Sequence, residues 1–131
     1  MYVASISKVK KITFETAGKT YTFDVLIDED DEVASVKLNG VKATVKSYRS
    51  LYTEFIGIAY KERDSKTYTS APDMTITVIQ TDGTKDVIQL VPATARRKMY
   101  LLNGKGGFLV SYDHVDKIQE LLKACEKSTI D

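Results

Sequence analysis

Two short stretches decide the fold: VKLNGVKATVKSY at residues 36–48 and YLLNGKGGFLVSY at residues 100–112. Both contain Leu-Asn-Gly, and a Ser-Tyr pair follows at the same distance in each. The two copies are 64 positions apart. Asn-Gly between alternating apolar residues is a strong hairpin signal, because a type I′ turn needs positive φ at both central residues. Asn39-Gly40 and Asn103-Gly104 are therefore predicted to be the turns of two equivalent hairpins.

The similarity extends to the segments that precede these hairpins. KKITFETAGKTYTFDVLI at residues 10–27 resembles MTITVIQTDGTKDVIQLV at residues 74–91, and their Ile-Thr pairs are again 64 positions apart. In each segment a turn glycine, Gly18 or Gly83, separates two runs in which apolar and polar residues alternate, as in strands. Similarity at a fixed offset indicates an internal duplication.

Each copy is predicted to end in an amphipathic helix. Ser47 is the expected N-cap of the first helix, and Ser111 or Asp113 that of the second, because these side chains accept hydrogen bonds from first-turn N–H groups. Gly57 would then lie inside the first helix, where it costs about 1 kcal/mol relative to Ala. Apolar residues follow each cap at helical spacing. The expected inner faces are Tyr48, Leu51, Tyr52, Phe55, Ile58 and Ala59 in the first helix, and Val115, Ile118, Leu121, Leu122 and Cys125 in the second.

The predicted fold class is α+β, with an internal duplication of a ββββα unit. Residues 1–131 would form a single compact domain of two repeat units, about 9–62 and 73–128, joined by a polar linker at 63–72. We expect two antiparallel meander sheets, each with a helix on one face, related by a pseudo-twofold axis. Joining them edge to edge as one eight-stranded sheet would remove two exposed edges.

Composition limits the function classes. The chain has 131 residues, of which 43% are hydrophobic and 28% charged, and its net charge is +1. This balance supports a globular core and gives no electrostatic attraction for nucleic acid or anionic lipid. The basic triplet Arg96-Arg97-Lys98 lacks interleaved aromatic residues, so no nucleic-acid partner is expected. A single Cys excludes an internal disulfide, and no apolar run approaches the roughly 20 residues that span a bilayer.

Two motifs resemble ligand-binding loops only in part. Asp28-x-Asp30-x-Glu32 begins like a calcium loop, but Val33 replaces the required Gly and Asn39 stands where a bidentate Glu is needed. We interpret it as a solvated acidic loop. The stretch at residues 104–107, Gly-Lys-Gly-Gly, lacks phosphate-loop spacing and precedes a strand, so it is interpreted as a hairpin. No metal or cofactor is expected.

Candidate catalytic residues are few. His114 is the only histidine, and it is interpreted as a surface residue in the first helical turn. Cys125 shares the inner face of the last helix, which favours a buried thiol over a nucleophile. Tyr21, Tyr48 and Tyr52 fall on predicted apolar faces and are expected in or beside the core. Because no nucleophile, base and orienting group can be assembled, we expect the protein not to be an enzyme.

Four longer motifs carry a resemblance to a known family, and they span about residues 8–125. They are ITFETAGKTYTFDV at 12–25, VKLNG at 36–40 with SYRSLYTEFIGI at 47–58, PDMTITVIQTDGT at 72–84 and KMYLLNGKGGFLVSYDHVDKI at 98–118. The chain resembles the bacterial domain-of-unknown-function family of membrane-anchored proteins encoded beside gliding-type ABC transporter permeases, in its Firmicutes form.

The resemblance implies an extracytoplasmic domain behind an N-terminal membrane anchor, with a protein partner in the cell envelope. It assigns no catalytic residue. Since this sequence shows no anchor, we expect it to be the C-terminal part of its parent protein with an added Met, soluble in this form and attached to the membrane only through the missing anchor.

Three functional hypotheses follow. The preferred one is a non-catalytic extracytoplasmic interaction module associated with an ABC transporter. The alternative is a small-molecule or peptide binding domain that uses the sheet face or a cleft between the repeats, for which a tyrosine-lined pocket would argue. An enzyme would require titratable groups clustered in a cleft around His114 or Cys125.

Overall fold

A computed structural model describes residues 6–16, 18–57, 60–63, 71–93 and 97–127 of the chain. Within those ranges lie nine strands, two α-helices and one short 3₁₀ helix. In chain order they are η1 Ile6–Lys8, β1 Val9–Thr16, β2 Lys19–Ile27, β3 Val33–Leu38, β4 Val41–Ala43, α1 Val45–Ile56, β5 Tyr60–Arg63, β6 Met74–Gln80, β7 Lys85–Pro92, β8 Arg97–Leu102, β9 Lys105–Ser111 and α2 Tyr112–Lys127.

All nine described strands belong to one antiparallel sheet, in the order β4-β3-β2-β1-β6-β7-β8-β9-β5. The predicted α+β class is confirmed. The two meanders, β1–β4 and β6–β9, are continuous through the β1–β6 pair, in which Phe14 stands opposite Ile76. Pairing β1 with β6 satisfies the backbone groups that two separate sheets would leave exposed at their edges.

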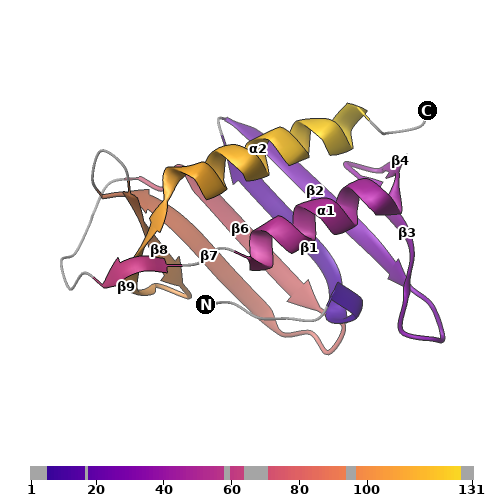
Figure 1. Cartoon of the computed structure of the whole chain (residues 1–131). Helices are drawn as coiled ribbons and strands as arrows, with labels where there is room; N and C mark the ends of the chain where they lie inside the picture. Colours follow the sequence, from indigo (N-terminus) through magenta and orange to yellow (C-terminus); the bar gives the residue numbers. More distant parts are fainter. Residues whose placement is uncertain (1–5, 17, 58–59, 64–70, 94–96, 128–131) are drawn as a thin grey trace.

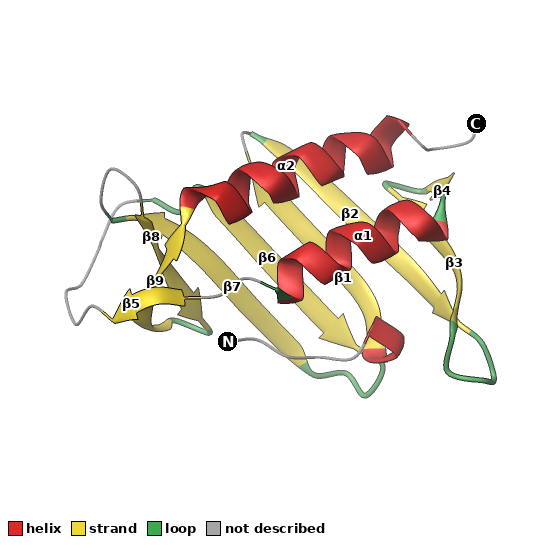
Figure 2. Cartoon of the chain, in the orientation of Figure 1, coloured by secondary structure: helices red, strands yellow, loops and turns green. Residues whose placement is uncertain are grey.

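Both α-helices cover the same face of this sheet and run antiparallel to each other (Figures 1 and 2). Alternation of side chains along the strands explains this arrangement. Ile12 and Phe14 on β1, and Ile76 and Val78 on β6, are all fully buried, while the residues between them point to the other face. One continuous apolar face therefore receives both helices.

The core beneath the helices differs between the two halves. In the N-terminal half five aromatic rings contact one another, with centroids 5.6 to 6.1 Å apart. They are Phe14, Phe23, Tyr48, Tyr52 and Phe55. In the C-terminal half the buried residues of β6, β7 and α2 are aliphatic or sulfur-containing. They are Met74, Ile76, Val78, Ile88, Leu90, Val115, Ile118, Leu122 and Cys125.

A second, smaller apolar cluster lies on the opposite face of the sheet from the helices. Val91, Met99 and Leu109 stand side by side on β7, β8 and β9 and are 2 to 3% exposed. They alternate along their strands with Leu90 and Tyr100, which belong to the helix-covered core. The last strands thus bury side chains on both faces.

The two Asn-Gly turns have nearly identical backbones. Asn39 and Gly40 have φ of 51° and 85°, and Asn103 and Gly104 have φ of 51° and 84°. Positive φ at both positions is the requirement of a type I′ turn. The side chain of each Asn also bonds to the second strand of its own half, β2 or β7. Asn39 Oδ1 accepts the Thr22 N–H at 2.9 Å, and Asn103 Oδ1 accepts the Val87 N–H at 2.7 Å.

The first helix begins earlier than expected. Thr44, not Ser47, is its N-cap, and the Ser47 N–H donates to Thr44 Oγ1 at 3.4 Å. The expected N-cap was wrong because Thr44 also has the side chain and the extended backbone that a cap needs, three residues upstream. Gly57 is the C-cap and not a mid-helix residue. Ile58 and Ala59 lie outside the described residues.

The region predicted as the end of the first unit and the linker contains a strand. β5 pairs with β9 and forms one edge of the sheet, and the expected repeat did not include it. Its sequence, Tyr-Lys-Glu-Arg, is polar and short, so it carries no alternating apolar signal. Residues 64–70 of the expected linker are not among those described.

Candidate functional site

A partly enclosed cleft lies beneath the C-terminal half of α2. Its volume is about 380 Å³, and it lies where that helix passes over the ends of β1 and β2. α2 follows the last strand of the C-terminal half, yet its end lies on the first strands of the N-terminal half (Figure 1). The cleft is therefore shared between the two halves.

An apolar floor is provided by one residue from each half. Tyr21 on β2 is 5% exposed, and Leu122 on α2 is fully buried. The strand alternation turns Tyr21 toward the helices, and the helical stripe turns Leu122 toward the sheet. Because Tyr21 presents a flat ring, the floor suits an aromatic or compact aliphatic group.

A hydrogen-bonded polar wall stands beside this floor. Gln119 Nε2 donates to Thr16 Oγ1 at 2.9 Å, and Thr16 Oγ1 donates to the Asp73 carbonyl oxygen at 3.2 Å. The Asp73 carboxylate in turn pairs with the Lys98 ammonium, whose side chain is 7% exposed. Burial lowers the pKa of Lys98, while the nearby Asp116 carboxylate raises it. This chain of contacts fixes the positions of Thr16 and Gln119 at the cleft.

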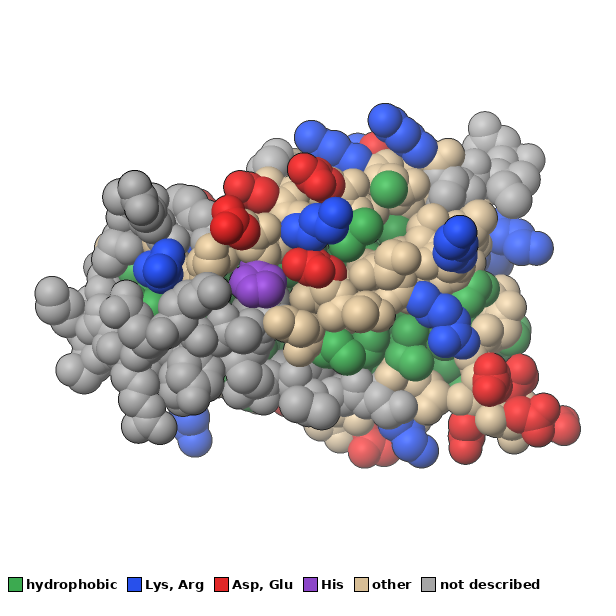
Figure 3. Space-filling view, viewed as in Figure 1, with side chains coloured by type: hydrophobic (Ala, Val, Ile, Leu, Met, Phe, Trp, Pro, Cys, Tyr) green, Lys and Arg blue, Asp and Glu red, His purple; other side chains and the backbone are tan. Residues whose placement is uncertain are grey.

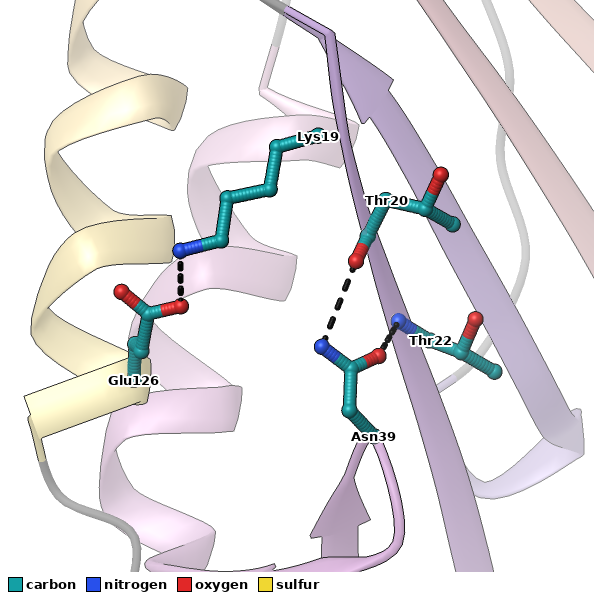
Figure 4. Close-up of polar contacts among 5 residues, drawn as sticks. All are labelled: Lys19, Thr20, Thr22, Asn39 and Glu126. Carbon is teal, nitrogen blue, oxygen red and sulfur yellow. Dashed lines mark hydrogen bonds and ion pairs between the residues drawn. The ribbon is translucent and has the colours of Figure 1, made fainter.

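An ion pair closes one side of the cleft. Lys19, the first residue of β2, reaches Glu126 near the end of α2 (Figure 4). The hydrogen bond to Glu126 raises the pKa of Lys19. Lys19 Nζ also lies 5.1 Å from the centroid of the Tyr21 ring. Both partners remain about half exposed, at 50% and 43%, so the pair is accessible to solvent and to competing ions.

Positive charge predominates at the rim. Three lysines and one glutamate line the cleft: Lys19, Lys123, Lys127 and Glu126. Lys123 and Lys127 are exposed and stand four residues apart on α2, and Gln119 precedes them by the same interval. Residues at this spacing share one side of a helix. The arrangement of an apolar floor, a fixed polar wall and excess cations can bind a small anion without performing chemistry on it.

The acidic loop is a tight turn whose first carboxylate is already engaged. Asp28 Oδ1 accepts the N–H groups of Asp30 and Glu32 at 2.9 and 3.0 Å. The five acidic side chains of residues 28–32 are exposed and protrude as a cluster beside β3 (Figure 3). Among the residues that the structure describes, no group of three His, Cys, Asp or Glu side chains could hold a metal ion.

His114 lies at the contact between the two helices and is partly exposed, so the interpretation as a surface residue is correct only in part. Its side chain is 23% exposed, and Nδ1 lies 3.4 Å from Oε1 of Glu54 on α1. The sequence pattern placed it outside the apolar stripe of α2, and it did not show that α1 packs along that side. Figure 3 shows the histidine near acidic groups on the helix-covered face.

Cys125 and the tyrosines take the positions expected of them. Cys125 is fully buried, and burial raises the pKa of its thiol to about 11, so the reactive thiolate is scarce at neutral pH. Tyr21, Tyr48 and Tyr52 are at most 5% exposed. Of Cys125 and these three tyrosines, Tyr21 alone lines the cleft. Neither Cys125 nor His114 is among the residues that line it.

Lys98 of the basic triplet is buried and not part of a surface patch. Lys98 faces the core and pairs with Asp73, because Lys98 stands opposite the buried Val110 on the helix-covered side of β8. Arg96 lies outside the described residues. The segment at residues 104–107 forms the Asn-Gly turn and the start of β9, as the hairpin interpretation required.

Sequence reasoning missed Lys19, Gln119 and Glu126 as cleft residues. Lys19 and Glu126 are 107 positions apart, so no local spacing connects them. A partial signal existed on α2, where Gln119, Lys123 and Lys127 recur every four residues beside the buried Leu122. That pattern identifies one polar side of the helix, but it cannot say which strand lies opposite.

No protein-family model, no curated protein and no solved structure matches this chain. Within the described part of the chain, neither α-helix is long and apolar enough to cross a membrane.

Proposed function

We propose that this protein is a non-catalytic interaction module, the extracytoplasmic part of a membrane-anchored bacterial protein that works with an ABC transporter and binds a protein partner in the cell envelope. Support comes from the resemblance of residues 8–125 to the family described above. The fold also leaves a row of polar side chains open to a partner. On the face opposite the two α-helices, Thr13 stands between Thr22 and Thr77 in one cross-strand row.

We propose further that the two ββββα units arose by internal duplication and are related by a pseudo-twofold axis. The strand order supports this, because β4-β3-β2-β1 is followed by β6-β7-β8-β9 outward from the central pair. The two Asn-Gly turns support it as well. Each turn bonds through its Asn side chain to the second strand of its own unit, at Thr22 and at Val87.

Copurification tests the interaction function. The parent protein is expressed with the permease encoded beside its gene, and the pair is extracted in detergent. We expect the permease to copurify with the parent protein and to be lost when residues 9–127 are deleted. An unrelated permease serves as the control. Equal recovery with and without residues 9–127 would contradict the proposal, because the partner would then bind the rest of the parent protein.

The shared cleft favours a second candidate function, small-molecule or peptide binding between the two units. The observation that carries it is the placement of Tyr21 from one unit and Leu122 from the other on a common floor. Its volume of about 380 Å³ falls in the range of ligand pockets, about 300–1,000 Å³. A ligand held there would contact both units and would stabilise the folded state by mass action.

A further inference from the structure

We infer that the cleft binds a small organic anion: a carboxylate or phosphate group attached to a compact apolar body. This inference rests on the second candidate function and names the chemical class of its ligand. The apolar body lies against Tyr21 and Leu122. The anionic group lies at the rim, among Lys19, Lys123 and Lys127.

Charge balance selects an anion. Lys19 is partly neutralised by Glu126, whereas Lys123 and Lys127 extend from the same helix with no acidic residue besides Glu126 lining the cleft. An arriving anion therefore meets an excess of two positive charges. A cation would meet three lysines and compete with Lys19 for the single carboxylate. Attraction between opposite charges at a partly enclosed surface exceeds that in bulk water.

Size and shape select a compact ligand. A cleft of about 380 Å³ with a buried ring as its floor is too small for a folded partner and suits one aromatic or short aliphatic group. The polar wall is preorganised, because Thr16 is held by both Gln119 and Asp73. A ligand does not have to order this wall, which lowers the entropic cost of binding.

The Lys19–Glu126 ion pair leads us to expect opposite changes in anion affinity when either charge is removed. In the free protein Glu126 competes with any ligand anion for Lys19, because the two residues form a direct ion pair across the cleft (Figure 4). Removing the Glu126 charge should strengthen anion binding, and removing the Lys19 charge should weaken it. An ion pair with a structural role alone would give no such opposition in ligand affinity.

The test uses four probes with one aromatic body each: benzoate, phenyl phosphate, benzamide and benzylammonium. Each is titrated into the isotope-labelled protein, and the amide resonances of Tyr21, Gln119 and Leu122 are followed by NMR. We expect both anions to shift these resonances and to bind at least about tenfold more tightly than the neutral and cationic probes. A tighter phenyl phosphate indicates a phosphate ester as the natural head group, and a tighter benzoate indicates a carboxylic acid.

Variants then test the charges. Glu126→Gln should bind benzoate and phenyl phosphate about three- to tenfold more tightly, and Lys19→Gln about three- to tenfold more weakly. Lys105→Gln, at an exposed lysine of the β8–β9 hairpin, is the matched control and should leave both affinities unchanged. The amide spectrum of each variant shows whether it remains folded.

The outcomes separate the inference from the function on which it rests. If benzamide or benzylammonium shifts the same resonances as strongly as the anions, the anion class is overturned and small-molecule binding stands. Inorganic phosphate is added as a fifth probe, which has no apolar body, and binding as tight as that of phenyl phosphate would overturn the role of the apolar body. If none of the probes shifts Tyr21 or Leu122, the inference falls. If a broader panel of neutral molecules and peptides also leaves these resonances unmoved, the binding function of the cleft falls with it.

Discussion

The two halves of the molecule use the same turns but different cores. Asn39-Gly40 and Asn103-Gly104 agree in φ within about a degree, and the side-chain oxygen of each Asn accepts a backbone N–H from the second strand of its half. Beneath the helices, in contrast, the N-terminal half packs five aromatic rings and the C-terminal half packs mainly aliphatic side chains.

This difference teaches which positions tolerate change. A type I′ turn needs positive φ at both central residues, and few residue types adopt it, so turn sequences are narrowly restricted. A core needs apolar volume at close packing, which many combinations of side chains provide. The resemblance between the halves is therefore strongest in their turns, where the backbone conformation restricts the choice.

The largest expected effect contrasts two buried neighbours at the junction of the halves. Phe14 and Ile76 stand opposite each other on β1 and β6, and both are fully buried. Phe14→Ala should lower the free energy of unfolding by about 3–5 kcal/mol. Ile76→Ala should cost about 1–2 kcal/mol less, because Phe14 also makes edge-to-face contacts with Phe23 and Phe55, each worth about 0.5–1.5 kcal/mol.

Urea unfolding at neutral pH measures both values. Phe14→Leu supplies a milder variant if the Ala variant does not fold, and Ile76→Val is its counterpart. An equal or larger loss at Ile76 would show that the aromatic contacts add nothing to area burial, and the contrast between the two cores would lose its energetic meaning.

The next prediction tests the equality of the turns. Gly40→Val and Gly104→Val should each destabilise the fold by about 1–3 kcal/mol, because a β-branched residue is strained at positive φ. A Cβ added at either glycine meets nothing within 4 Å, so the cost is in the backbone alone and should be the same in both halves.

Denaturation midpoints give the two losses side by side. Lys105→Val, at an exposed strand position directly after Gly104, carries the same side chain without the positive φ and should be close to neutral. Losses that differ by more than about 1 kcal/mol would mean that the two turns are not energetically equivalent.

Much of the fold could be predicted from these turns and from strand alternation. The four strands of each half, the α+β class and both helices follow from period-2 and period-3.6 patterns that the core confirms at Phe14, Phe23 and Leu90. The position of β5 could not be predicted, because its four residues, Tyr-Lys-Glu-Arg, show no alternation of apolar and polar residues in the sequence. The sequence also could not decide whether Thr44 or Ser47 is the N-cap of α1, since both residue types are good N-caps.

The cleft could not be predicted, for a different reason. It depends on where α2 lies across the sheet, and that position is set by packing between distant segments. Tyr21 was recognised as a residue on an apolar face, but its neighbour Leu122 is 101 positions away, from 21 to 122. Only the three-dimensional arrangement brings Lys19 to Glu126 and Gln119 to Thr16.

A smaller effect, this time a gain in stability, is expected at Tyr48 in the N-terminal half. The hydroxyl of Tyr48 is buried, and the described residues offer it no hydrogen-bond partner. Burial raises the pKa of Tyr48, so the hydroxyl stays protonated and uncharged at neutral pH. Tyr48→Phe should therefore increase the free energy of unfolding by about 1 kcal/mol, because an unpaired buried polar group is removed and the ring is kept.

Thermal or urea unfolding measures this gain. Tyr21→Phe, in the same half, is the comparison, and we expect it to stay within about 0.5 kcal/mol of the parent protein because Tyr21 lies at the cleft. A loss of stability in Tyr48→Phe would show that the hydroxyl has a partner in solution.

The last prediction is that added metal ions leave the melting temperature unchanged, and it concerns the acidic β2–β3 loop. The β2–β3 connection carries five consecutive acidic residues, 28–32, so Ca²⁺ could act on the N-terminal half and leave the other half unaffected. We expect melting curves with Ca²⁺, Mg²⁺, Zn²⁺ or EDTA to coincide. Asp28 Oδ1 already accepts two backbone N–H groups, and Asn39 stands where a calcium loop needs a bidentate Glu.

If a metal ion did bind, the gain in stability would be easy to measure. A ligand that binds only the folded state adds about 2.7 kcal/mol at a hundredfold excess over its dissociation constant, which is more than the expected gain at Tyr48. A saturable shift with Ca²⁺ that disappears in Asp28→Asn would turn the acidic loop into a metal site. The difference between the halves would then extend from packing to ligand binding.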